Sequence, residues 1–219
     1  MMITGDLFGE LTDSKPQQLR LTEGAIILCG FVHEIDHLLL HEIEAVVLKA
    51  PFRNMITPGG YRMSVAMSNC GPVGWVSDRS GYRYAACDPE SGRPWPAMPV
   101  LFLDVAKRAA ARAGFENFVP DACLINLYEP GTRLSLHQDK DEQDASAPIV
   151  SVSLGLPAIF LFGGAKRNIR PTRYPLEHCD VVVWGGPARF NYHGILPIAE
   201  GHHPLLGSKR INLTFRKAR

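Results

Sequence analysis

Hydrophobic residues recur at helical spacing in two stretches of the first half of the chain. Residues 99–113 predict one helix, with Pro99 in its first turn and Gly114 as its C-terminal stop. Residues 31–50 predict an earlier one, since their apolar positions recur every three or four residues. These positions are Ile35, Leu38, Leu39, Ile43, Val46 and Val47.

From residue 121 onward the pattern changes to short apolar or alternating runs, which predict β-strands. The runs are residues 122–128, 148–156, 158–164, 180–186, 189–194 and 210–216. Closely spaced strands of this kind are typical of a barrel or jelly roll. Residues 51–97 are rich in Gly, Pro, Ser and Tyr, and predict loops and short hairpins. The expected fold is therefore mainly β, with N-terminal helices.

Composition indicates one soluble domain. The chain has 219 residues, of which 46% are hydrophobic and 21% charged, with a net charge of +1. It contains no run long enough to span a membrane, and the N-terminal MMITGDLFGE has no signal-peptide pattern. The cysteines are odd in number and widely spaced, so we expect reduced thiols and a cytoplasmic location. They are Cys29, Cys70, Cys87, Cys123 and Cys179.

The stretch SLHQDKDE (residues 135–142) carries candidate chemistry. If it is extended, His137, Asp139 and Asp141 share one face. An imidazole beside a carboxylate is either part of a metal site or part of a solvated loop. His193 is the strongest candidate for a third ligand, because it lies in a separate extended run. Two His and one carboxylate form the facial triad of non-heme Fe(II) oxygenases.

The other histidines and basic residues have plainer interpretations. His33, His37 and His41 share a helical face, and a solvated stripe is favoured there over a metal site. A cluster of four basic residues favours a solvated loop over a binding patch. The cluster comprises Lys166, Arg167, Arg170 and Arg173.

The last strand separates two kinds of side chain. Period-2 geometry puts Arg210, Asn212, Thr214 and Arg216 on one face, and apolar residues on the other. Inside a barrel these arginines would require an anion, and a dicarboxylate would satisfy both. The alternative is an exposed edge strand. A small ligand that touches both arginines also requires the strand to curve, because six residues of straight strand span about 20 Å.

Taken in order along the chain, these motifs resemble the AlkB family of Fe(II)- and 2-oxoglutarate-dependent nucleic-acid demethylases. The resemblance runs from about residue 51 to 216 and includes PFRNMITPGGYRMSVAMSNCG, RPWPAMP, PDACLINLYEPG, LSLHQDKDE and DVVVWGG. It implies a double-stranded β-helix, which is a jelly roll. It also implies a single domain that comprises an N-terminal extension and helix (1–50), a nucleotide-recognition lid (51–97) and a catalytic core (98–219).

The resemblance assigns roles residue by residue. The iron ligands would be His137, Asp139 and His193. The 2-oxoglutarate site would comprise Asn126, Leu127, Tyr128, Arg210, Asn212 and Arg216. Substrate contacts would come from Trp75, Tyr82, Arg83, Tyr84, Asp141 and Arg167. For Arg167 this raises the odds of a binding role, and for Asp141 it suggests recognition of a cationic methylated base.

The implied function is oxidative demethylation of bases such as 1-methyladenine and 3-methylcytosine. The reaction uses Fe(II), 2-oxoglutarate and O2, and releases formaldehyde, succinate and CO2. The expected partner of this monomeric enzyme is alkylated single- or double-stranded DNA, with RNA as an alternative. Two rival functions stay open at this point. One is an oxygenase that acts on a protein or metabolite, and the other is a non-catalytic binder of the same fold.

Overall fold

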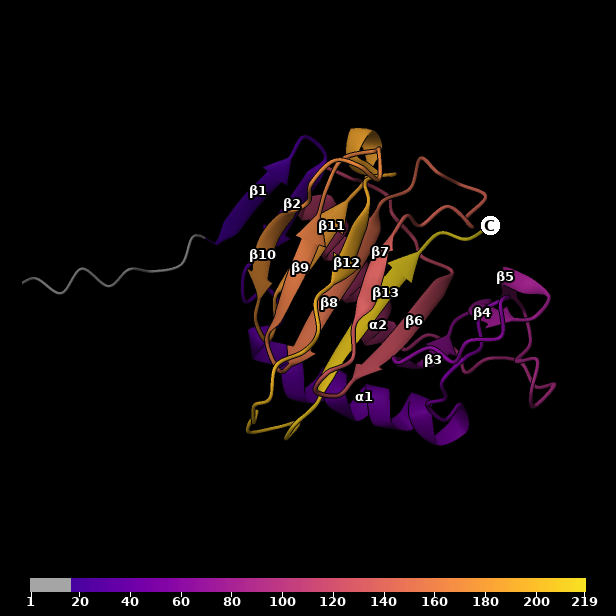
Figure 1. The fold of residues 1–219 in the computed structure, drawn as a ribbon. Coiled ribbons are helices and arrows are strands. Elements are labelled where there is room, and N and C mark those ends of the chain that lie inside the picture. The colour runs from indigo at the N-terminus through magenta and orange to yellow at the C-terminus, as the bar shows by residue number, and fades with distance from the viewer. Residues whose placement is uncertain (1–16) are drawn as a thin grey trace, which may run out of the picture.

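The structure is a computed structural model in which residues 17–219 are described, so the segment MMITGDLFGE lies outside the described residues. Within residues 17–219, no helix is long and apolar enough to cross a membrane. Two β-sheets lie one in front of the other in Figure 1, with helix α1 along one end and helix α2 behind the larger sheet. This mainly β architecture agrees with the expected fold class.

The larger sheet has seven strands, and all its neighbouring strands are antiparallel. In spatial order they are β1 (Gln18–Thr22), β2 (Ala25–Leu28), β11 (Val181–Trp184), β8 (Ile149–Gly155), β13 (Arg210–Arg216), β6 (Ala122–Tyr128) and β3 (Ala66–Cys70).

The smaller sheet has four strands, in the order β10 (Thr172–Leu176), β9 (Ala158–Phe162), β12 (His193–Ile195) and β7 (Leu134–His137). A separate hairpin pairs β4 (Gly74–Asp78) with β5 (Gly81–Ala85). In Figure 1 this hairpin projects to one side of the two sheets.

The helices form where the hydrophobic spacing predicts them. α1 spans Asp36–Lys49 after a short 3-10 turn, η1 (His33–Ile35), and α2 spans Val100–Arg112. A second 3-10 turn, η2, covers Gly186–Ala188. Gly114, expected as a C-terminal stop, has a φ of +87° just beyond α2, a conformation that glycine adopts without strain.

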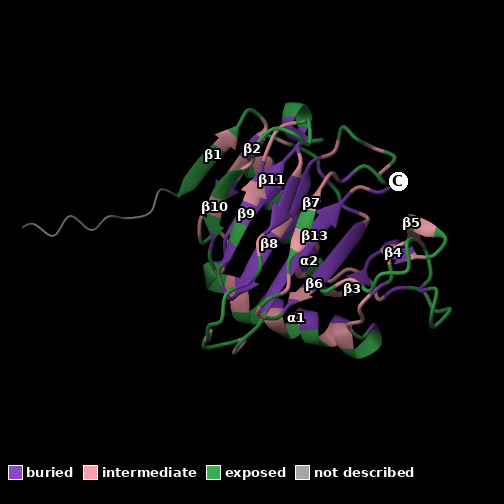
Figure 2. Cartoon of the chain, in the orientation of Figure 1, coloured by how far each residue is buried: buried purple, intermediate pink, exposed green. Residues whose placement is uncertain are grey.

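Alternation along β13 divides the protein into two hydrophobic regions. Ile211, Leu213 and Phe215 pack with both helices in one buried cluster. Arg210 and Arg216 project from the opposite face, toward the space between the two sheets. Figure 2 shows that the central strands are almost entirely buried. β13 is therefore a central strand, flanked by β6 and β8, and the alternative of an exposed edge strand is wrong.

Several strands lie where the pattern did not predict them. Residues 18–28 form β1 and β2, although only a helix was expected before residue 50. β2 belongs to the larger sheet because it pairs with β11. The expected strand at 189–194 is a turn and loop up to His193. The segment 51–97 contributes β3 to the larger sheet as well as the β4–β5 hairpin.

Candidate metal centre and cosubstrate cavity

Strand pairing brings two histidines together across the smaller sheet. β7 and β12 are antiparallel, and His137 is the direct partner of His193. The two ring centroids lie 4.4 Å apart. The Nδ1 atom of His137 lies 2.9 Å from the carbonyl oxygen of Ser135, and that of His193 lies 3.0 Å from the carbonyl oxygen of Asn191. These carbonyls accept the Nδ1 protons, so both Nε2 atoms keep a lone pair for a metal.

Asp139 supplies a carboxylate between these two imidazoles. Its oxygens lie 3.6 Å from His137 Nε2 and 3.7 Å from His193 Nε2. Burial alone would raise the pKa of Asp139, but the nearby positive charge of Arg216 holds it well below its usual range. Burial, followed by the charge of His193, lowers the pKa of His137 to about 4. At neutral pH Asp139 is therefore a carboxylate and His137 is a neutral imidazole, which suits a divalent metal.

The expected alternation of SLHQDKDE holds only in its first half. β7 ends at His137, and Asp139 and Asp141 follow in an irregular loop. Both aspartates nevertheless line the same cavity as His137. Gln138 and Lys140, which an extended strand would turn away, line it as well. His137, Asp139 and Asp141 therefore come together because of the loop that follows β7, and not because they share one face of a strand.

The cavity has a volume of about 520 Å³ and lies between the two sheets. One wall is polar and is formed by Asn126, Tyr128, Arg210, Asn212 and Arg216. Arg210 is fully buried; it donates to Ser153 Oγ at 2.8 Å and more weakly to the Leu156 carbonyl at 3.4 Å. Its Nε atom and the Oδ1 atom of Asn126 have no hydrogen-bond partner.

The two polar atoms without partners indicate whether a dicarboxylate could bind at this wall of the cavity. Within residues 17–219 no carboxylate forms a salt bridge with Arg210, and burial lowers its pKa to about 10. A buried cation without a paired anion is costly. Arg216, in contrast, donates to Asp139 Oδ2 through Nε at 3.1 Å and through NH2 at 2.9 Å. The wall can therefore hold an anion at Arg210, with the metal ligands at its other end.

Aromatic and acidic groups line another part of the same cavity. The rings of Trp75 and Tyr82 are stacked, with centroids 5.6 Å apart and planes 13° from parallel. The indole Nε1 of Trp75 donates to Asp141 Oδ2 at 2.9 Å. The guanidinium of Arg167 lies 5.7 Å from the ring centre of Tyr192. The cavity thus joins a flat aromatic platform, an exposed carboxylate and a cation.

Comparison with known proteins agrees with this arrangement. A family model of the 2OG-Fe(II) oxygenase superfamily matches residues 24–216. The chain is 57% identical over 213 residues to the Alpha-ketoglutarate-dependent dioxygenase AlkB of Escherichia coli, a match that covers 97% of each chain. The chain belongs to the AlkB family of 2OG-Fe(II) oxygenases. It is therefore a dioxygenase that requires Fe(II), 2-oxoglutarate and O2.

Two further relatives extend this comparison. The human Nucleic acid dioxygenase ALKBH1 is 36% identical over 100 residues, which cover 44% of this chain and 26% of the human protein. The solved structure of OsALKBH1 superposes with a TM-score of 0.80 at 28% identity and covers 91% of this chain. The AlkB-family fold thus extends over nearly all of the described residues.

Three of the residues expected at the site have contacts elsewhere. The Leu127 side chain packs on the helix-covered face, opposite to its neighbours Asn126 and Tyr128. Arg83 forms a bidentate pair with Asp78, at 2.9 and 2.7 Å. Tyr84 donates its hydroxyl proton to Glu142 Oε1 at 2.5 Å. None of these three residues lines the cavity.

Sequence reasoning missed a buried carboxylate that joins these groups. The Glu142 side chain is 2% exposed and lies within salt-bridge distance of Arg189 NH2 (2.9 Å) and Arg216 Nε (3.4 Å). Arg189 also donates to the carbonyl oxygen of Asp139 at 2.6 Å. Glu142 therefore connects the β5 hairpin to the loop that carries Asp139. The sequence signal for Glu142 was its position in the stretch SLHQDKDE, next to the candidate metal ligands. The local pattern of polar and apolar residues does not show that its side chain is buried.

Proposed function

We propose that this AlkB-family dioxygenase oxidatively demethylates N-alkylated bases in nucleic acid, such as 1-methyladenine and 3-methylcytosine. The products would be the repaired base, formaldehyde, succinate and CO2. One observation carries the proposal: the His137–Asp139–His193 group, the unpaired cation Arg210 and the Trp75–Tyr82 platform all line one cavity. The identity to AlkB and the similarity to the human Nucleic acid dioxygenase ALKBH1 support nucleic acid as the substrate class.

In this proposal the metal and the cosubstrate are bound by different residues. His137, Asp139 and His193 would hold Fe(II), which would supply the activation of O2. Arg210 and Tyr128 would hold one carboxylate of 2-oxoglutarate, and Arg216 would face its other end, next to the metal ligands. The other residues expected at the 2-oxoglutarate site are proposed to contribute amide and backbone groups. They are Asn126, Leu127 and Asn212.

The substrate base is proposed to bind between the platform and the metal group. An alkylated base must leave its stack to reach such a cavity, and stacking on an aromatic side chain contributes about 1–3 kcal/mol. Trp75 and Tyr82 offer that surface. Asp141 carries the charge that a cationic methylated base requires, and it would exchange its bond to the Trp75 indole for the ligand.

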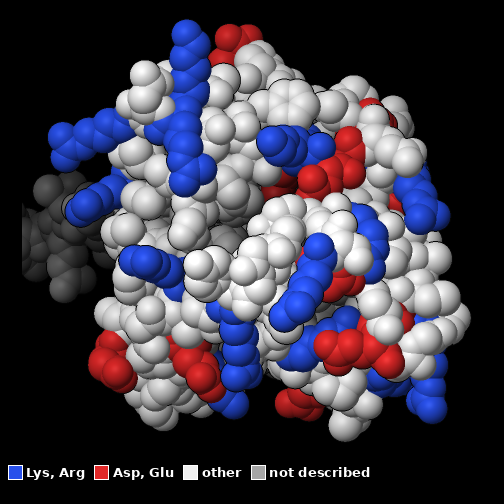
Figure 3. Space-filling view, turned by 45° about the vertical axis from the view of Figure 1, so that its right-hand side comes forward, with Lys and Arg blue, Asp and Glu red and all other residues white. Residues whose placement is uncertain are grey.

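Residues 51–97 are proposed to act as a nucleotide-recognition lid, with the β4–β5 hairpin as its projecting part. Arg83 and Tyr84 support that hairpin through Asp78 and Glu142. Arg167 is proposed to contact the nucleic-acid backbone, because it is a cation that lines the same cavity as Trp75 and Tyr82. Figure 3 shows further Lys and Arg side chains spread over one face of the molecule, with Asp and Glu side chains among them. We propose that residues 1–50 and 98–219 form one domain with this lid; residues 1–16 of that range lie outside the described residues.

The proposed setting is a cytoplasmic monomer that acts on alkylated DNA, single- or double-stranded, or on RNA. Cys70, Cys87, Cys123 and Cys179 are free thiols in this structure, which agrees with a reducing compartment. One chain supplies every group named above, so no second copy is needed. Light scattering at working concentration measures the oligomeric state, and a dimer would contradict this part.

The test of substrate class is succinate release. Oligonucleotides that contain 3-methylcytosine should stimulate it, whereas methylated peptides should not. Stimulation by peptides alone would favour the rival oxygenase that acts on proteins. Absence of any iron-dependent 2-oxoglutarate turnover would favour the non-catalytic binder.

A further inference from the structure

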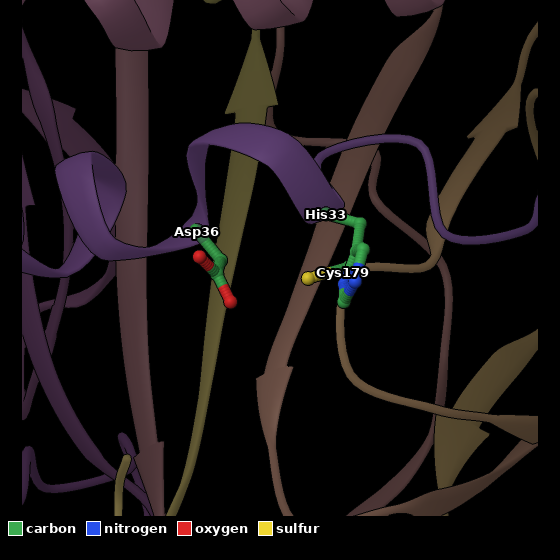
Figure 4. A group of neighbouring side chains, drawn as sticks. All are labelled: His33, Asp36 and Cys179. Atoms are coloured by element: carbon green, nitrogen blue, oxygen red, sulfur yellow. The ribbon is translucent and has the colours of Figure 1, made fainter.

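A second group of metal-ligating side chains lies outside the catalytic cavity. It consists of His33, Asp36 and Cys179, whose ligand atoms all lie within 4.8 Å of one another. Figure 4 shows the Cys179 sulfur between the Asp36 carboxylate and the His33 ring. None of the three residues lines the cavity described above. The catalytic roles of the AlkB-family site therefore do not account for this group.

Two segments that are far apart in sequence build it. His33 and Asp36 are three residues apart at the junction of η1 and α1, and residues i and i+3 of a 3-10 turn lie on the same side. Cys179 belongs to the turn between β10 and β11. The Val32 amide donates to the Cys179 carbonyl at 3.3 Å, and the Cys179 amide donates to the Ser153 carbonyl at 2.7 Å. Backbone contacts therefore hold the thiol beside the other two side chains.

The backbone at Cys179 is unusual for a residue with a side chain. Its φ is +72°, a left-handed conformation that favours glycine. The residue is also fully buried. A strained conformation kept in a buried turn is a reason to look for a function of its side chain.

The Asp36 carboxylate is already oriented for a ligand. Its Oδ2 atom accepts a hydrogen bond from His178 Nε2 at 2.9 Å, and its Oδ1 atom accepts one from the His37 amide at 2.6 Å. His178 is itself fixed, because its Nδ1 atom accepts from the Gly155 amide at 2.9 Å. A histidine that donates to a carboxylate in this way is the support commonly found around ligands in metal sites.

The charges around the thiol favour a cation. The Asp36 carboxylate lies within 4.8 Å of the thiol, so a bound cation would sit beside a negative charge that favours it. A thiolate, an imidazole and a carboxylate together match the ligand preferences of Zn²⁺ and exclude hard oxygen-seeking ions such as Mg²⁺.

We propose that His33, Asp36 and Cys179 form a second metal site that binds a zinc-type divalent ion, with water as the fourth ligand. Tetrahedral Zn²⁺ with bonds of about 2.0–2.3 Å brings ligand atoms to roughly 3.3–3.8 Å from one another. His33 is exposed and can close the remaining gap by a side-chain rotation. The bound ion would fasten the start of α1 to the β10–β11 turn.

Cobalt(II) absorption distinguishes this site from the catalytic one. A Co²⁺ ion bound by thiolate has a sulfur-to-metal charge-transfer band, and among the described residues no cysteine lines the catalytic cavity. The wild-type chain should bind two Co²⁺ ions, one of which produces that band, and Zn²⁺ should displace it. The measurement requires no turnover, so it is independent of the proposed function.

Two variants and one control complete the experiment. Cys179→Gly removes the thiol where the φ suits glycine, so the fold should survive while the band and one Co²⁺ equivalent are lost. His33→Ala, at an exposed position, should weaken Co²⁺ binding to this site at least tenfold. Cys87→Ser removes an exposed thiol elsewhere and should change neither. A wild type without the band, or a band that persists in Cys179→Gly, would overturn the proposal.

Discussion

Arg210→Met is expected to have opposite effects on stability and on cosubstrate binding. Arg210 is fully buried, and its bonds go to a hydroxyl and a carbonyl rather than to a carboxylate. Methionine has a similar length and no charge. Without 2-oxoglutarate, the variant should therefore unfold less readily than the wild type.

The size of this effect follows from the pKa of Arg210. Burial lowers that pKa from its ordinary value to about 10, which corresponds to about 3 kcal/mol against the charged form in the folded protein. A lowered pKa of a cation means that the unfolded state binds protons more tightly, so the full cost is present at neutral pH and is relieved only as pH rises above about 10. Because methionine also loses the bond to Ser153, we expect a net gain of about 1–2 kcal/mol in the free energy of unfolding.

Affinity for the cosubstrate should change in the other direction. A hydrogen bond to a charged group contributes about 1.5–3 kcal/mol, so the loss of one such contact weakens 2-oxoglutarate binding roughly 10- to 150-fold. Urea denaturation with and without 2-oxoglutarate measures both quantities on the same samples. The ligand should stabilise the wild type and have little effect on the variant.

Arg189→Met is the matched control. Arg189 is equally buried, but it is paired with Glu142 at 2.9 Å, and removal of one partner of a buried pair costs about 3–5 kcal/mol. Equal destabilisation by Arg210→Met and Arg189→Met, with unchanged 2-oxoglutarate affinity in the former, would refute the interpretation of Arg210 as an unpaired cation.

Three further predictions concern other parts of the molecule. Asp141→Asn should lower kcat/KM for 3-methylcytosine about tenfold or more relative to the neutral lesion 1-methylguanine; an unchanged ratio, measured in matched oligonucleotides, would contradict charge recognition. Tyr84→Phe removes the hydroxyl that donates to Glu142, so the free energy of unfolding in urea should fall by about 1–3 kcal/mol and the KM for oligonucleotide should rise. Unaltered stability would mean that this hydrogen bond does not hold the β4–β5 hairpin to Glu142. Burial would raise the pKa of Asp88, but its bond to Arg53 lowers it to about 2, so its contribution of about 2 kcal/mol should be present at neutral pH and about half lost near pH 3. Compared with the wild type, Asp88→Asn should therefore lose less unfolding free energy at pH 3 than at neutral pH. An equal loss at both pH values would argue against the Arg53–Asp88 pair.

Local periodicity predicted the parts of this fold that depend on one face being apolar. The alternation in residues 210–216 predicted which side chains of β13 pack on the helices and which enter the cavity. The helical spacing in residues 31–50 and 99–113 likewise predicted α1 and α2. In both cases burial itself produces the sequence pattern.

Long-range pairing was not predictable in this way. β1 and β2 are short, and β2 becomes a strand of the larger sheet through its pairing with β11, more than 150 residues later in the chain. The partnership of His137 with His193 depends on the register between β7 and β12, which only the fold reveals. Glu142 looked like one more acid in a polar run, because its arginine partners come from residues 189 and 216.

The most direct test of the proposed function is mass spectrometry of a single-stranded oligonucleotide that carries 3-methylcytosine. After incubation with enzyme, Fe(II), 2-oxoglutarate and O2, the oligonucleotide should lose the mass of one methylene group, and formaldehyde and succinate should appear in equal amounts. Asp139→Ala should abolish this conversion, because the carboxylate between the two imidazoles is lost. An oligonucleotide of unchanged mass despite succinate release, or full conversion by Asp139→Ala with iron still bound, would contradict the account.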